Sequence, residues 1–149
     1  MKIAARIFST FFGAGYFPLA PGTFCSLLMV ILYKFYLYKL SWLLYLMILI
    51  FGYFTGVYTS SKYSTEINKD DPRVIVIDEA LGQLFVLFML GTEWLLLFLS
   101  FAFFRLFDIL KPFPIKKIET LPKGWGIMTD DLMAAAYARL IICLWLLLR

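Results

Sequence analysis

Apolar runs follow one another along almost the whole of this chain, and they leave few soluble folds open to it. Of its 149 residues, 62% are hydrophobic and only 16% are charged, whereas an ordinary soluble domain has about half apolar and a quarter charged residues. A soluble core of this size cannot cover so much apolar surface, so part of that surface has to face lipid. The length is that of one domain.

Five of the runs are long enough to be membrane helices. They predict an all-α, polytopic membrane helix bundle with about four to five transmembrane helices, the lower number applying if the first run is re-entrant. Ahead of them, residues 3–12 place apolar side chains at helical spacing, which is typical of a short interfacial helix. The expected segments are residues 24–38, 42–58 with an extension to 63, 75–90, 94–110 and 127–148.

The distribution of Lys and Arg predicts which side of the membrane each loop faces. Threading five crossings alternately puts Lys34, Lys39 and Arg149 on one side and ten basic residues on the side of the N-terminus. Cytoplasmic loops carry the excess of positive charge, so the N-terminal side is predicted to be cytoplasmic. The net charge of +4 lies between apolar segments, which favours an anionic membrane surface over nucleic acid as the partner. The ten residues are Lys2, Arg6, Lys62, Lys69, Arg73, Arg105, Lys111, Lys116, Lys117 and Lys123.

Five carboxylates lie in or at the ends of the apolar segments, where an isolated charge costs about 2.5–3.5 kcal/mol on insertion scales. The threading brings all five to the cytoplasmic side, near the depth of lipid headgroups. Converging carboxylates repel one another unless a cation, a basic group or a proton lies among them. Hard oxygen ligands without His or Cys favour Mg²⁺ over zinc, and the chain has no His. The predicted metal ligands are Asp78, Glu79, Asp108, Asp130 and Asp131.

Some of these acids also have plain structural interpretations. Asp108 lies three positions from both Arg105 and Lys111 on one helix face, so it can form an ordinary ion pair. Asp130 or Asp131 can be the N-cap of the last helix. Intramembrane acids also serve as cation or proton relays, and a membrane transporter or ion carrier with a cation site is the alternative function. A relay would place its acids nearer the bilayer centre.

Two further groups of residues are candidates for holding an anion beside the acids. A proline–glycine turn at residues 21–22 predicts a helix start, with Thr23 and Ser26 where free N–H groups and hydroxyls suit an anion. A plain helix start capped by Thr23 is the alternative. Arg105 and Lys111 bring a guanidinium and an ammonium group that bind phosphate oxygens well.

Four ordered stretches carry the motifs of the chain: residues 13–27 (GAGYFPLAPGTFCSL), 74–82 (VIVIDEALG), 104–115 (FRLFDILKPFPI) and 124–131 (GWGIMTDD). In order and spacing they resemble the motifs of the phosphatidylglycerophosphatase A family. Two positions depart from that pattern, since a cysteine at position 25 and a lysine at position 123 stand where glycine is common in the family.

The resemblance implies a single membrane-embedded phosphatase domain over residues 1–149, in the bacterial inner membrane and multi-pass. It implies hydrolysis of phosphatidylglycerophosphate to phosphatidylglycerol and phosphate with Mg²⁺, at an active site that faces the cytoplasm. No nucleic-acid partner is expected.

The mechanism that we expect from these residues is a metal-assisted attack on a phosphomonoester. The metal lowers the pKa of a bound water or orients it in line, and it neutralises developing charge. A phosphohistidine mechanism is excluded because the chain has no His. Asp78 or Glu79 is the candidate base. The predicted catalytic group is Asp78, Glu79, Asp108 and Asp131, and the predicted substrate-binding group is Thr23, Ser26, Arg105 and Lys111.

Overall fold

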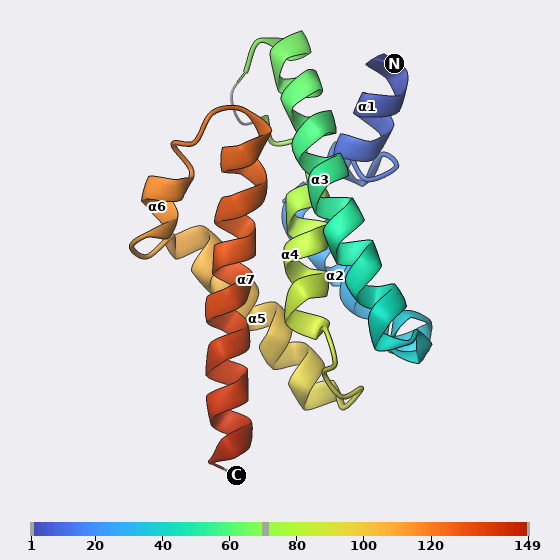
Figure 1. Cartoon of the computed structure of the whole chain (residues 1–149), viewed down its shortest axis with the longest axis vertical. Coiled ribbons are helices and arrows are strands. Elements are labelled where there is room, and N and C mark those ends of the chain that lie inside the picture. The colour runs from blue at the N-terminus through green and yellow to red at the C-terminus, as the bar shows by residue number, and fades with distance from the viewer. Residues whose placement is uncertain (1, 70–71, 149) are drawn as a thin grey trace.

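The computed structural model describes residues 2–69 and 72–148, and over these residues the chain is all-α, as predicted (Figure 1). Arg149, one of the three basic residues assigned to the far side of the membrane, lies outside the described residues. Two of the helices, η1 and η2, are short 3₁₀ helices. In chain order the elements are α1 (Lys2–Ser9), η1 (Ala14–Tyr16), α2 (Pro21–Phe35), η2 (Leu37–Lys39), α3 (Trp42–Ile67), α4 (Ile77–Leu87), α5 (Trp94–Leu110), α6 (Ile115–Ile118) and α7 (Gly124–Leu147).

Local sequence explains where the long helices begin and end. Pro21 occupies the first turn of α2, where the missing N–H of a proline costs nothing. The hydroxyl of Ser41 caps α3 by accepting the N–H of Leu44 at 3.4 Å. After α3 and α5, Asn68 and Lys111 take left-handed conformations with φ of 52° and 42°, and each donates its N–H to a carbonyl of the last turn.

The last long helix, α7, begins earlier than predicted. The expected segment starts at residue 127, next to Asp130 and Asp131, whereas the helix starts at Gly124. Both acids therefore lie about two turns inside the helix, and the interpretation of either one as its N-cap is wrong. The glycine is needed at the start of α7 because a Cβ there would overlap the carbonyl oxygen of Val57 in α3.

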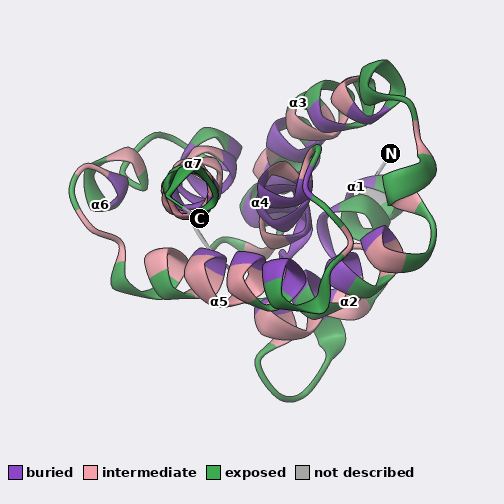
Figure 2. Cartoon of the chain, turned by 90° about the horizontal axis from the view of Figure 1, so that it is seen from below, coloured by how far each residue is buried: buried purple, intermediate pink, exposed green. Residues whose placement is uncertain are grey.

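The short helix α4 lies at the centre of the bundle, with α2, α3, α5 and α7 around it (Figure 2). Nine of its 11 residues are buried. Small residues let its neighbours approach closely: Ala134, Ala135 and Ala138 of α7 are fully buried. On α4 itself, a Cβ on Gly82 would lie only 2.6 Å from the ring of Phe104 in α5.

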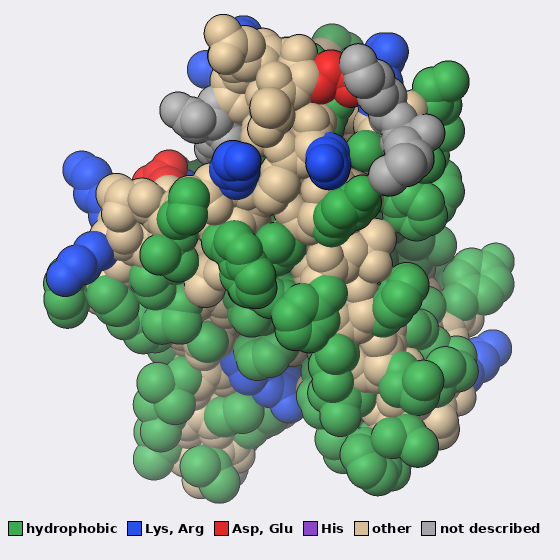
Figure 3. Space-filling model, turned by 45° about the horizontal axis from the view of Figure 1, so that its top comes forward, with side chains coloured by type: hydrophobic (Ala, Val, Ile, Leu, Met, Phe, Trp, Pro, Cys, Tyr) green, Lys and Arg blue, Asp and Glu red, His purple; other side chains and the backbone are tan. Residues whose placement is uncertain are grey.

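The outer surface of the bundle is strongly apolar. Phe51 of α3, Phe98 of α5 and Leu147 of α7 are each more than half exposed, and Figure 3 shows hydrophobic side chains over much of one face, with several Lys and Arg side chains above them. By length and composition alone, one helix of the described residues, α3, is suited to cross a membrane. The 11 residues of α4 rise only about 16 Å, roughly half of a hydrocarbon core. The number of membrane spans therefore stays a prediction.

Candidate active site

The start of α4, the end of α5 and the first turns of α7 meet at one cavity of about 230 Å³. The first turn of α2 and the segment that precedes α4 complete its wall. All five acids predicted to be metal ligands line this cavity, although they come from three different helices. Its lining includes Gly22, Thr23, Arg73, Asp78, Glu79, Arg105, Asp108, Lys111, Asp130 and Asp131.

Asp78, Glu79 and Asp131 form the tightest group of acids. Each of them offers one carboxylate oxygen, and these oxygens all lie within 4.8 Å of one another. Asp78 is only 8% exposed and Asp131 only 3%, so water screens their charges poorly. Oε2 of Glu79 and Oδ2 of Asp131 are buried and accept no hydrogen bond from the described part of the chain. Crowded carboxylate oxygens of this kind are the ligands that a hard divalent cation prefers.

A glycine at the start of α2 explains how Glu79 reaches this group. Gly22 leaves room for the glutamate, because a Cβ there would overlap Oε1 of Glu79. Ala20, just before the helix, provides no side-chain cap. The first N–H groups of α2 therefore have no partner within the helix, and they lie at the part of the cavity wall that Gly22 and Thr23 form.

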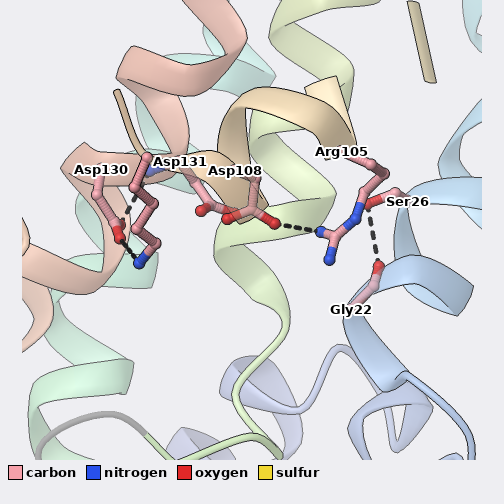
Figure 4. A network of polar contacts seen from close by, with 7 residues as sticks. Gly22, Ser26, Arg105, Asp108, Asp130 and Asp131 are labelled. Carbon is pink, nitrogen blue, oxygen red and sulfur yellow. Dashed lines mark hydrogen bonds and ion pairs between the residues drawn. The ribbon is translucent and has the colours of Figure 1, made fainter. Parts of the chain in front are cut away.

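The other two acids are paired with cations. Oδ2 of Asp108 lies 2.7 Å from Nη1 of Arg105, one turn earlier on α5. Nζ of Lys111 lies 2.7 Å from Oδ2 of Asp130 and 2.8 Å from Oε1 of Glu119. Figure 4 shows the pair of Arg105 with Asp108, and Asp130 beside Asp131. Of the two ion pairs that the sequence allowed for Asp108, the structure therefore contains the one with Arg105.

Lys111 carries its charge at the edge of the cavity. Burial disfavours the ammonium form, but the bonds that it donates to Asp130 and Glu119 outweigh this and raise the pKa of Lys111 above its ordinary value. The backbone supports this placement, because Lys111 is the left-handed residue that ends α5. Both bases predicted to bind phosphate, Arg105 and Lys111, are thus engaged by acids.

Of the two hydroxyls predicted to bind substrate, one lines the cavity and the other does not. Thr23 belongs to the cavity wall. Ser26 lies one turn deeper in α2 and is fully buried, and its hydroxyl donates to the carbonyl of Gly22 at 3.0 Å (Figure 4). Such a bond to the carbonyl four residues earlier is a common resting place for a serine inside a helix.

The sequence analysis did not single out Arg73, which also lines the cavity. It entered only as one of ten basic residues on the cytoplasmic side. The available signal was its position, five residues before Asp78 and directly ahead of the acidic motif. Its side chain is exposed, so it stands at the mouth of the cavity and not in its floor.

One family model and several known proteins match most of this chain. The family model described as Phosphatidylglycerophosphatase A matches residues 7–146. A Haemophilus influenzae protein named Phosphatidylglycerophosphatase A is 38% identical over 133 residues, which are 88% of this chain and 82% of that protein. An Escherichia coli protein of the same name is 34% identical over 125 residues, 83% and 72% of the two chains. A Bacteroides thetaiotaomicron protein, named provisionally as a phosphatidylinositol-3-phosphatase, is 32% identical over 145 residues, 91% and 89% of the two chains. No solved structure gives a significant match.

Proposed function

The chain belongs to the phosphatidylglycerophosphatase A family and is a phosphoric monoester hydrolase, and we propose that it hydrolyses the terminal phosphomonoester of phosphatidylglycerophosphate with Mg²⁺ bound by Asp78, Glu79 and Asp131. The observation that carries this proposal is the meeting of three carboxylate oxygens within 4.8 Å in a largely buried place. Repulsion among these groups would disfavour the fold unless a cation completed the site.

The donor set fits Mg²⁺. The three acids supply only hard oxygen ligands, and two of their buried oxygens, Oε2 of Glu79 and Oδ2 of Asp131, receive no hydrogen bond from the described residues. Mg²⁺ commonly takes one or two carboxylates and completes its shell with water and substrate phosphate. When bound, the ion supplies charge neutralisation at the phosphate and a water of lowered pKa. Asp78 or Glu79 is the candidate base that would accept the proton of the attacking water.

Groups of the chain itself hold the phosphate beside these acids. The free N–H groups at the first turn of α2 and the hydroxyl of Thr23 form an anion-binding wall at the positive end of that helix. Arg105 adds a guanidinium whose direction is set by its ion pair with Asp108, which lowers the cost of ordering it around the substrate. Asp108 and Asp130 stay predicted metal ligands, and in this structure they hold Arg105 and Lys111.

We place this site at the cytoplasmic face of the bacterial inner membrane, in a single multi-pass domain. Two observations support the placement. The outer surface of the bundle is apolar. The connections before α4 and between α5 and α7 carry Arg73, Lys116, Lys117 and Lys123, in keeping with the excess of positive charge in cytoplasmic loops. The phosphomonoester of a lipid headgroup would lie at the same depth as the acids.

The test is phosphate release from phosphatidylglycerophosphate in detergent micelles by the purified protein, with Mg²⁺ and with EDTA. We expect release only with Mg²⁺. Asp78→Asn, Asp108→Asn and Asp131→Asn should each abolish turnover in a protein that still folds in detergent. Glu93→Gln is the matched control, since Glu93 lies before α5 at the far end of the bundle, and it should keep the wild-type rate. Near-wild-type rates in all three aspartate variants would reject the assignment.

The same preparation also tests the transporter alternative. Reconstituted into liposomes, a carrier that uses the acidic cavity as a cation site would move a divalent cation across the bilayer. Cation flux without phosphate release would select the transporter, and phosphate release without flux would select the phosphatase.

A second headgroup merits the same assay. One of the relatives is named for a phosphoinositide, whose headgroup also joins a phosphomonoester to a lipid phosphodiester through a polyol. Release of phosphate from phosphatidylinositol 3-phosphate at a rate comparable to that from phosphatidylglycerophosphate would show that the site selects this shared arrangement and not the glycerol itself.

A further inference from the structure

Three basic side chains line the active-site cavity, and acids hold two of them. Arg105 is paired with Asp108, and Lys111 is paired with Asp130. The third is Arg73. Its side chain is exposed, and within residues 2–69 and 72–148 it makes no ion pair and no side-chain hydrogen bond. Among the described residues, Arg73 is therefore the basic side chain of this cavity that no acid engages.

The backbone that carries Arg73 is clamped against the N-terminal part of the chain. The N–H of Val76 donates to the carbonyl of Ser9 at 3.0 Å. Gly15 packs so closely on the same segment that a Cβ there would overlap the carbonyl oxygen of Val74. The base of the side chain is thus fixed at the edge of the cavity, and little backbone ordering is required when a ligand binds.

The lipid substrate brings a second negative charge to this edge. Phosphatidylglycerophosphate carries a terminal phosphomonoester and a phosphodiester, joined by a three-carbon glycerol. If the acids with their cation and the first turn of α2 take the phosphomonoester, the phosphodiester lies toward the lipid and the cavity mouth. An unpaired anion in a partly desolvated place is costly, and the planar fork of an arginine suits phosphate oxygens.

We propose that Arg73 binds the phosphodiester of the lipid substrate and makes the site prefer a lipid phosphomonoester over a small one. This inference rests on the function proposed above and names the group that recognises the lipid part of its substrate. A small phosphomonoester such as glycerol 3-phosphate lacks the phosphodiester, so Arg73 contributes to the binding of the lipid and not to that of the small ester.

The experiment compares kcat/KM for phosphatidylglycerophosphate in micelles with kcat/KM for glycerol 3-phosphate. Arg73→Gln should lower the ratio of the two by about tenfold, which is the loss of one charge-assisted phosphate contact, mainly through a higher KM for the lipid. Arg73→Lys should recover part of the ratio, because it keeps the charge and loses the fork. Thermal unfolding in detergent checks that both variants fold. If Arg73→Gln does not fold, the ratio measured for Arg73→Lys decides the test.

Lys69→Gln is the matched control. It removes a positive charge from the same connection between α3 and α4, and Lys69 is exposed and does not line the cavity. An equal fall of the ratio in Lys69→Gln would assign the effect to general attraction to the micelle and overturn the proposal. An equal loss of kcat/KM on both substrates would leave the ratio unchanged and put Arg73 on the terminal phosphate. No loss on either substrate would show that Arg73 has no part in recognition, and both results also overturn the proposal. A wild-type protein without lipid phosphatase activity would instead refute the proposed function.

Discussion

The two ends of α4 are both enclosed by the bundle, but their surroundings differ in kind. At the C-terminal end, side chains from neighbouring helices satisfy the last carbonyls. The hydroxyl of Tyr45 in α3 donates to the carbonyl of Leu84 at 2.9 Å, and Nη1 of Arg139 in α7 donates to the carbonyl of Val86 at 3.0 Å. A short helix can therefore stop inside the bundle without leaving its final turn unpaired.

At the N-terminal end the neighbouring helices bring further acceptors and few donors. Asp78 and Glu79 of α4 meet Asp131 of α7, and Oε2 of Glu79 and Oδ2 of Asp131 receive no hydrogen bond from the described residues. An unsatisfied buried polar group costs about 1–3 kcal/mol, and more if it is charged. The chain completes one end of α4 with its own groups, and at the other end the proposed function assigns that task to a bound cation.

The two ends of α4 therefore have different tasks under the proposed function. The C-terminal end supports the fold, so its loss should reduce stability more than chemistry. Under the proposed function, the N-terminal end carries the chemistry at the expense of stability, as functional sites commonly do. Variants at the C-terminal end should therefore lower the free energy of unfolding, and variants at the N-terminal end should lower turnover.

The largest effect is expected for Asp131→Asn. Even outer-shell partners of a metal cost 10- to 100-fold when they are removed, so the loss of a proposed ligand should lower Mg²⁺-dependent phosphate release by more than about a hundredfold. In EDTA the variant should unfold at the wild-type temperature or above it, because a buried and repelled charge has been removed. A clearly lower unfolding temperature in EDTA would mean that the chain itself satisfies Asp131, and the contrast between the two ends would fail.

Mg²⁺ itself should stabilise the wild-type protein. A ligand at about 100 times its Kd adds about 2.7 kcal/mol to the free energy of unfolding, which appears as a rise of several degrees in the unfolding temperature. Asp131→Asn should lose this rise, and Na⁺ at equal ionic strength should not produce it. The same rise in both proteins would place the cation elsewhere.

A smaller effect, on stability and not on Mg²⁺ binding, is expected for Arg139→Met. This change leaves the Val86 carbonyl without its donor and should lower the free energy of unfolding by about 1–3 kcal/mol. The Mg²⁺-induced rise in unfolding temperature should remain, because the acids at the other end are untouched. Arg139→Lys, which keeps a donor, should lose less stability. Loss of the Mg²⁺ effect in Arg139→Met would show that the two ends of α4 are not independent.

The smallest effect is expected for Tyr45→Phe. Removal of its hydroxyl deletes the hydrogen bond to the Leu84 carbonyl and should cost about 1 kcal/mol of unfolding free energy in detergent. Tyr58→Phe is the control on the same helix, since Tyr58 is 50% exposed and should change stability by less than about 0.5 kcal/mol. Equal effects of the two changes would mean that the Tyr45 hydroxyl has no special role in capping α4.

Sequence reasoning located the starts of the long helices to within three residues, because apolar runs and turn residues act locally, but it ended α3 too early, since that helix continues to Ile67, past the predicted extension to residue 63. Pro21 marks the start of α2, and Pro112 follows directly after the end of α5. It erred where a distant contact set the boundary: α7 begins at Gly124 because α3 packs against that glycine. The length of α4, which bears on the number of membrane spans, likewise depends on caps supplied by other helices.

For the site, the sequence indicated the carboxylates and the bases but not how they pair. Asp108 and Lys111 lie three residues apart at the end of α5, yet the lysine bonds to Asp130 of α7 and the aspartate to Arg105. Spacing allowed either Arg105 or Lys111 as the partner of Asp108, and helix rotation and side-chain conformation decided between them. The pair of Lys111 with Asp130 joins residues of different helices, so no spacing along one helix encodes it. Arg73 was missed for a related reason, since its place at the cavity depends on how the segment before α4 packs against the N-terminal residues.

By itself, then, the sequence determined the all-α class, the order of the helices, the family and the set of charged groups placed in apolar surroundings. These follow from hydrophobic runs, turn residues and motifs that act over a few neighbouring positions. Only the tertiary structure decided which three acids meet, which bases are already engaged and where α4 stops. Those outcomes depend on close contacts between residues far apart in the chain, such as Gly22 against Glu79 and Gly82 against Phe104.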